Sequence, residues 1–163
     1  MKLIKNLIRI IFLLAAVVLT AMLAFTHYDI NRMYGWQTLA LGSTDARDMH
    51  DYLQQVQFTM EKYNMTEGFA SVIHWPEHNM AYIHRAVTGQ VAQAELLSTL
   101  DPASSEYQSG MINLRKAVNN LDLQAHKYWY LNTGGIVAVL TVMFWLVFIV
   151  STLSWMRNNQ TRE

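Results

Sequence analysis

The chain has 163 residues, 52% of them hydrophobic, and its net charge is zero because 12 Lys and Arg balance 12 Asp and Glu. It contains no cysteine, which excludes disulfides, thiol chemistry, iron–sulfur clusters and thioether-linked haem. No basic patch with interleaved aromatic residues occurs, so nucleic acid is not an expected partner.

The N-terminal segment combines a basic start with a long apolar run. Its basic residues are Lys2, Lys5 and Arg9. A cleaved signal peptide begins in the same way, but cleavage after Ala24 would place Met22 where a small side chain is preferred. We therefore expect residues 10–26 to form an uncleaved transmembrane helix, preceded by a cytoplasmic tail of residues 1–9.

Hydrophobic residues between the two apolar runs recur at steps of three and four, the spacing of amphipathic helices. We expect the first helix to continue outward to Gly42, which ends it. Ile30, Met33, Tyr34, Gln37 and Leu41 follow one face of it. The second helix is expected to start at a cap on Ser43 or Thr44. Its stripe is Met49, Tyr52, Leu53, Val56, Met60 and Tyr63.

Two proline positions predict the starts of two further helices. Proline is favoured as the first helical residue, so one helix should begin at Pro76 and the next at Pro102, with Asp101 as its cap. Gly89 lies inside the first of these and is expected to mark close packing. The second should run unbroken to about Asn132. Its seam is Met111, Leu114, Val118, Leu121, Ala125 and Tyr128.

The second apolar run, residues 134–155, carries no charge. At 1.5 Å per residue it reaches roughly 33 Å, enough to cross a bilayer core as a helix. We assign residues 133–155 to a second transmembrane helix and residues 156–163 to a cytoplasmic tail. Lys and Arg lie beside both spans on one side, which places both termini in the cytoplasm and residues 27–132 outside.

The predicted fold class is therefore all-α: two transmembrane helices that bracket an extracytoplasmic antiparallel helical bundle. The expected location is the bacterial inner (plasma) membrane. This layout resembles the sensory half of bacterial chemoreceptor-type proteins, in the order and length of its segments. The eight residues after Trp155 are too few for a signalling module, so a signal is expected to leave laterally through the membrane.

The densest set of possible metal ligands lies between the second and third expected helices. It consists of His74, Glu77, His78 and His84, with Met80 beside them. Imidazole with carboxylate suits zinc, nickel or copper. The spacing matches no recognised ligand motif, and ordinary surface histidines are the preferred interpretation.

A second histidine pair, His27 and His126, adjoins the two apolar runs. The two side chains could approach each other at the outer membrane face and ligate a b-type haem or contact a quinone. The alternative, which we prefer, is that they are simple residues of the headgroup layer. The sequence thus predicts no cofactor.

No set of nucleophile, base and orienting residue can be assembled, and no Gly-rich phosphate loop, HExxH or GxSxG occurs. We expect a non-enzymatic regulatory or accessory subunit whose outer bundle docks a membrane or periplasmic protein, or a second copy of itself. One alternative is a metal- or haem-binding membrane protein. Another is a small exclusion or immunity factor of a mobile genetic element.

Overall fold

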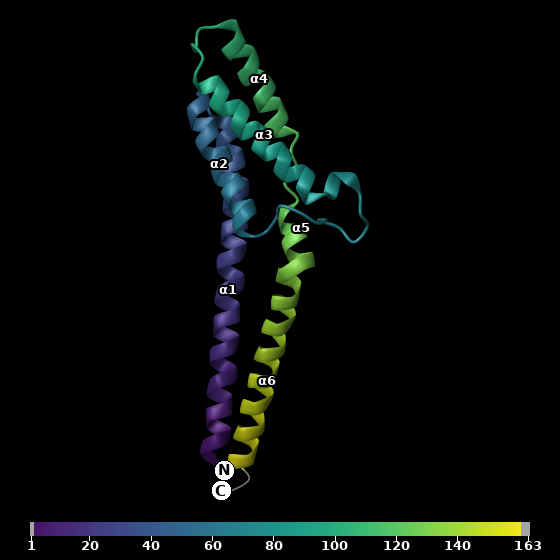
Figure 1. Cartoon of the computed structure of the whole chain (residues 1–163). Helices are drawn as coiled ribbons and strands as arrows, with labels where there is room; N and C mark the ends of the chain where they lie inside the picture. Colours follow the sequence, from purple (N-terminus) through teal and green to yellow (C-terminus); the bar gives the residue numbers. More distant parts are fainter. Residues whose placement is uncertain (1, 161–163) are drawn as a thin grey trace. The chain divides into compact units, whose positions relative to one another are not determined.

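The computed structural model describes residues 2–160, and all its named elements are helical (Figure 1). The elements are α1 (Lys2–Gly42), α2 (Ala46–Lys62), the 3₁₀ turn η1 (Pro76–His78), α3 (Met80–Ser98), α4 (Ser105–Asn119), α5 (Ala125–Trp129), the π-helical turn η2 (Tyr130–Gly134) and α6 (Gly135–Gln160). The all-α prediction is confirmed. The chain divides into two compact units, one of which is His27–Leu131 and the other the segments before and after it.

Two helices are long and apolar enough to cross a membrane, within Asn6–Gly42 and Ala125–Arg157, and each contains an 18-residue window with a mean hydropathy of 2.6. Most of their large apolar side chains are exposed. The helices contact each other through a few specific pairs. Phe12 and Phe144 pack with ring centroids 5.4 Å apart, and the Trp145 indole donates to the Thr20 hydroxyl at 3.0 Å. The Thr141 hydroxyl donates to the Val137 carbonyl, so this polar group is satisfied within its own helix.

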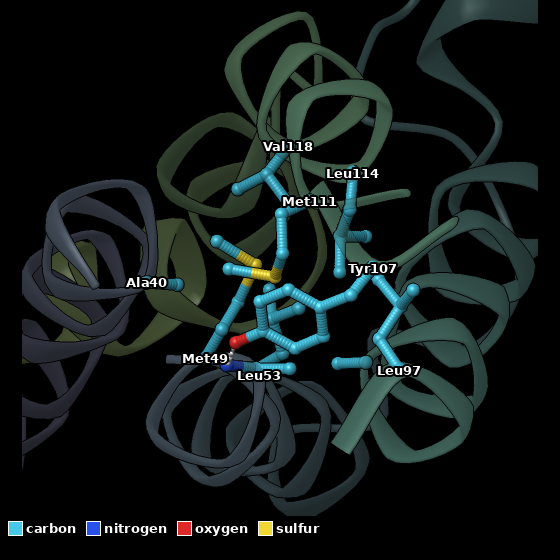
Figure 2. Packing of buried hydrophobic residues seen from close by; sticks show 10 residues of the cluster. Ala40, Met49, Leu53, Leu97, Tyr107, Met111, Leu114 and Val118 are labelled. Carbon is cyan, nitrogen blue, oxygen red and sulfur yellow. Dashed lines mark hydrogen bonds between the residues drawn. The ribbon is translucent and has the colours of Figure 1, made fainter. Parts of the chain in front are cut away.

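The His27–Leu131 unit has a core to which α1, α2, α3 and α4 all contribute (Figure 2). The cluster comprises Ala40, Ala46, Met49, Leu53, Ala94, Leu97, Tyr107, Met111, Leu114 and Val118. Five of these residues, Met49, Leu53, Met111, Leu114 and Val118, belong to the stripes predicted for the second and last helices, which confirms the helical spacing there as a guide to burial. Ala40, Ala46 and Tyr107 lie outside the predicted stripes. The Tyr107 hydroxyl accepts the backbone N–H of Ala46 at 3.0 Å. This bond satisfies one of the amide groups that a helix leaves unpaired at its start.

The helix starts differ from the predicted positions, because other polar side chains provide the caps. Gly42 does end α1, but Asp45 caps α2 by accepting the N–H of Arg47 at 2.9 Å. Pro76 begins only the short turn η1, while Asn79 caps α3. Ser104, and not Asp101, caps α4.

The predicted single helix through residues 102–132 is wrong, because α4 ends at Asn119. Gln124 has a left-handed backbone conformation (φ 50°), and α5 begins at the next residue. Leu114 and Val118 are buried as expected, whereas Leu121 lies in the break and is only half-buried. Leu123 is fully buried instead.

The two glycines inside α3 and α4 have opposite surroundings. No heavy atom lies within 4 Å of the position that a Cβ on Gly89 would occupy, so this glycine does not mark close packing, contrary to the prediction. A Cβ on Gly110 would lie 2.4 Å from Cδ2 of the buried Leu97. The Leu97 side chain therefore occupies space that Gly110 leaves free on α4.

We expect Gly89→Ala to raise the free energy of unfolding by up to about 1 kcal/mol, because alanine loses less backbone entropy in a helix interior. Gly110→Ala should lower the free energy of unfolding. The methyl group would overpack against Leu97 at a cost of about 1–3 kcal/mol, which exceeds the gain from the higher helix propensity of alanine. Denaturant unfolding of the two full-length variants in detergent measures the difference. Shifts of the same sign in both variants would contradict the packing of Leu97 on Gly110.

Candidate functional site

An aromatic stack joins α1 to α2 on the surface of the His27–Leu131 unit. The Trp36 ring of α1 stacks on the Tyr52 ring of α2, with centroids 5.8 Å apart and planes 16° from parallel. The Arg32 guanidinium lies 5.1 Å from the centroid of the Trp36 indole, a cation–π contact. Arg32 and Trp36 are four residues apart on one helix and therefore share a face. The stack holds Trp36 and Tyr52, both half-buried, in fixed positions.

Phe58 of α2 lies between two hollows beside this stack. Its side chain is 60% exposed. The larger hollow, about 520 Å³, is lined by Gln54, Gln55, Gln57, Phe58 and Glu61. The smaller one, about 140 Å³, is lined by Asp29, Arg32, Trp36, Gln55, Phe58, Thr59 and Lys62. We call Arg32, Trp36, Tyr52, Gln55 and Phe58 the α1–α2 surface.

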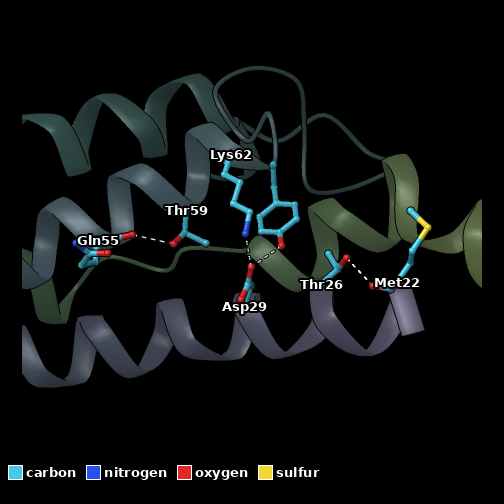
Figure 3. Close-up of polar contacts among 7 residues, drawn as sticks. Met22, Thr26, Asp29, Gln55, Thr59 and Lys62 are labelled. Carbon is cyan, nitrogen blue, oxygen red and sulfur yellow. Dashed lines mark hydrogen bonds and ion pairs between the residues drawn. The ribbon is translucent and has the colours of Figure 1, made fainter. Parts of the chain in front are cut away.

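A polar network closes one end of the α1–α2 surface (Figure 3). The Asp29 carboxylate accepts hydrogen bonds from the Lys62 ammonium at 2.5 Å and from the Tyr63 hydroxyl at 2.7 Å. The bond from Lys62, followed by that from Tyr63, lowers the pKa of Asp29. The same bond to Asp29 raises the pKa of Lys62. Both groups therefore stay charged over the physiological range and neutralise each other, which leaves Arg32 as the cation beside the aromatic rings.

The α1–α2 surface contains residue types that are frequent in protein interfaces. Tryptophan, tyrosine and arginine are the residue types that dominate binding energy at protein interfaces. The glutamines around Phe58 add donors and acceptors without a net charge. Sequence reasoning assigned Tyr52 to a core stripe and did not single out Trp36 or Phe58. The sequence does indicate that Phe58 is exposed. Phe58 lies between Val56 and Met60 in the chain but falls outside their apolar stripe, on the polar side of α2.

The structure gives each predicted metal ligand around α3 a different environment. His74 stacks on Phe69 with centroids 4.2 Å apart, and Nδ1 of His78 lies 2.8 Å from the Ser71 hydroxyl. His84 bonds through Nε2 to Glu61 at 3.2 Å, and Glu77 is exposed on η1. Within residues 2–160, no three His, Cys, Asp or Glu side chains form a group that could hold a metal ion.

His27 and His126 do lie together, with ring centroids 5.2 Å apart. The His126 ring also stacks on Tyr34 at 5.3 Å, 7° from parallel, and its Nε2 lies 2.9 Å from Oδ1 of Asn31. An iron between two imidazoles needs a nitrogen–metal distance of about 2 Å on each side, and the two ring radii add to that span. The two rings are tilted by 40° and lie in ring contact, the geometry of an aromatic pair.

Comparison of the chain with protein-family models, curated proteins and solved structures finds no match. Among the features described, the α1–α2 surface combines an exposed aromatic anchor with open hollows. The histidine pair instead forms part of a stack that links α1 to α5.

The stack around His126 makes the His27–Leu131 unit sensitive to acid. Burial, and secondarily the nearby His27, lowers the pKa of His126. Its Nδ1 is buried and has no hydrogen-bond partner among the described residues, so a proton added there would have no acceptor. The folded protein therefore disfavours the charged imidazole.

We expect the melting temperature to fall between about pH 7 and pH 5. A histidine whose folded pKa is lowered contributes stability that is present above its ordinary pKa of about 6.5 and is lost as the pH falls through that value. Thermal unfolding of the full chain and of His126→Gln across this range checks the expectation. The variant should show a shallower pH dependence, and an unchanged slope would assign the acid sensitivity to other groups.

Proposed function

We propose that this chain is a non-enzymatic regulatory or accessory subunit of the bacterial inner membrane. Its His27–Leu131 unit lies outside the membrane and docks a partner protein through the α1–α2 surface. The supporting observation is the position of Phe58, which is 60% exposed between two hollows and adjoins the stack of Arg32, Trp36 and Tyr52. Exposed aromatic side chains with rigid neighbours are typical interface anchors.

The surroundings of Phe58 define the chemistry of the partner. An apolar pocket would receive the phenyl ring, because burial of a phenylalanine stabilises by about 1.5–3 kcal/mol. Backbone or amide groups around that pocket would pair with the glutamines. Asp29 and Lys62 neutralise each other at the rim. The stack keeps Trp36 ordered before binding, which reduces the entropy lost on docking.

The membrane part of the proposal rests on the two apolar helices within Asn6–Gly42 and Ala125–Arg157. In α1, 41 residues extend about 60 Å, twice the thickness of a bilayer core. The apolar part would lie in lipid while the remainder joins the His27–Leu131 unit. Basic residues at both chain ends favour a cytoplasmic position for both termini.

Reporter fusions test this topology. A fluorescent protein that folds only in the cytoplasm should be active when fused after Glu163 and inactive when inserted next to Ser104. Alkaline phosphatase, which needs the oxidising periplasm, should give the opposite result. The same compartment for both positions would rule out the two-pass arrangement, and a mature N-terminus near Phe25 would show that the first apolar segment is cleaved.

A photo-crosslinking amino acid at position 58 tests the docking surface in living cells. We expect one discrete adduct from position 58 and none from position 82. Tyr82 of α3 is the matched control, since it is an aromatic residue of similar exposure, 62%, outside the α1–α2 surface. Phe58→Ala should then weaken binding of the purified partner by at least about 2 kcal/mol, or roughly 30-fold in Kd.

Tyr82→Ala should leave that Kd unchanged. Equal crosslinking from both positions, or an unaltered Kd for Phe58→Ala, would contradict the assignment of the α1–α2 surface. An adduct between two copies of this chain would identify the surface as a homo-oligomer interface. The exclusion or immunity hypothesis predicts the same surface, and a partner that belongs to a competing mobile element would favour it over a host regulatory subunit.

A further inference from the structure

The loop between α2 and η1 exposes a compact set of apolar side chains. Residues 69–75, the apolar loop, contain no Asp, Glu, Lys or Arg. Three of its side chains are largely exposed, Val72 at 83%, Ile73 at 67% and Trp75 at 53%. Adjacent exposed apolar side chains are unfavourable in water and indicate a contact surface.

The apolar loop is held in shape by its polar groups. The N–H of Ala70 donates to the His78 carbonyl at 2.8 Å, and that of Met80 to the Gly68 carbonyl at 2.9 Å. The Ser71 hydroxyl donates to the Ile73 carbonyl and also pairs with the His78 ring. Gly68, with φ +85°, provides the left-handed conformation at the entry. The outward position of Val72 and Ile73 is thus a property of an ordered loop.

Contacts within the His27–Leu131 unit hold the base of the apolar loop close to residues near the first and last positions of that unit. The Tyr128 hydroxyl donates to the Asn64 carbonyl at 2.9 Å, and the Tyr128 ring lies against Gly68. Asp29 binds the last turn of α2 through Lys62 and Tyr63. Asp29 lies within one helical turn of Thr26, and Tyr128 about one turn before Asn132. Both anchors therefore lie close in sequence to the apolar helical segments.

We propose that the apolar loop inserts Val72, Ile73 and Trp75 into the outer headgroup layer of the same bilayer that the two apolar helices cross. Trp75 has the amphipathic ring that is favoured at this depth. Tyr28 and Tyr130, next to the apolar segments in sequence, also expose their rings, as an interfacial aromatic belt requires. The loop's lack of formal charge favours a lipid surface over a polar protein. This inference rests on the proposed membrane insertion of α1 and α6.

Depth-dependent quenching in liposomes tests the inference. Because the chain has no cysteine, Ile73→Cys accepts one environment-sensitive fluorophore on the full-length protein. Ile112→Cys on α4 is the matched control, an isoleucine of similar exposure, 64%. Val142→Cys in α6, 58% exposed, reports insertion of the helix itself. The liposomes contain phosphatidylcholine with a nitroxide on the headgroup or on the acyl chain.

We expect headgroup nitroxides to quench the probe at position 73 roughly twofold or more above that at position 112, as for side chains at the headgroup–acyl boundary. Acyl-chain nitroxides should quench the probe at position 142. Quenching at 142 with no excess at 73 would overturn the loop inference and leave the membrane proposal standing. Absence of quenching at 142 would overturn both. Protection of position 73 only after addition of a protein partner would assign the loop to protein binding and overturn the lipid contact.

Discussion

A buried contact joins Tyr107 of α4 to the first turn of α2, where the core of the His27–Leu131 unit fixes which side of α2 is buried. The Tyr107 hydroxyl accepts the Ala46 N–H, and Ala46, Leu53 and Met60 are then buried at intervals of two helical turns. Phe58 lies about 200° around the helix from the buried Val56, so it must point away from the core. The exposed aromatic anchor is therefore a consequence of how α2 packs.

The helix α2 contributes to both surfaces with a proposed function. Near its middle, Tyr52 stacks on Trp36 and defines one side of the α1–α2 surface. At its C-terminal end, Lys62 and Tyr63 bind Asp29, and the chain enters the apolar loop. A protein contact through Phe58 and a lipid contact through Ile73 would thus share one rigid helix. A partner bound to the first surface could influence how the apolar loop meets the bilayer, because packed helices transmit displacement with little deformation.

The break after α4 shows where local pattern reasoning fails. Residues 119–124 contain no glycine or proline, so the heptad-like seam predicts a continuous helix. The Gln37 side chain of α1 donates to the carbonyls of Val118 and Leu121 at 3.1 and 2.8 Å, and Asp122 accepts the N–H of Gln124. The two bonds from Gln37 pair carbonyls that a continuing helix would have bonded itself. Gln37 lies more than 80 residues away in the chain, beyond the reach of any local signal.

The sequence alone predicts the helical class, the two apolar helices and most of the buried stripe of α2, because periodic burial and long apolar runs are local properties. The tertiary structure decided which polar side chains cap the helices and where α4 ends. It also brought His27 to His126 and separated the histidines around α3, since those distances depend on how distant helices pack. Phe58 illustrates both cases. Its position outside the apolar stripe can be read from the sequence. The hollows beside it and the nearby Trp36 depend on the packing of α1 against α2.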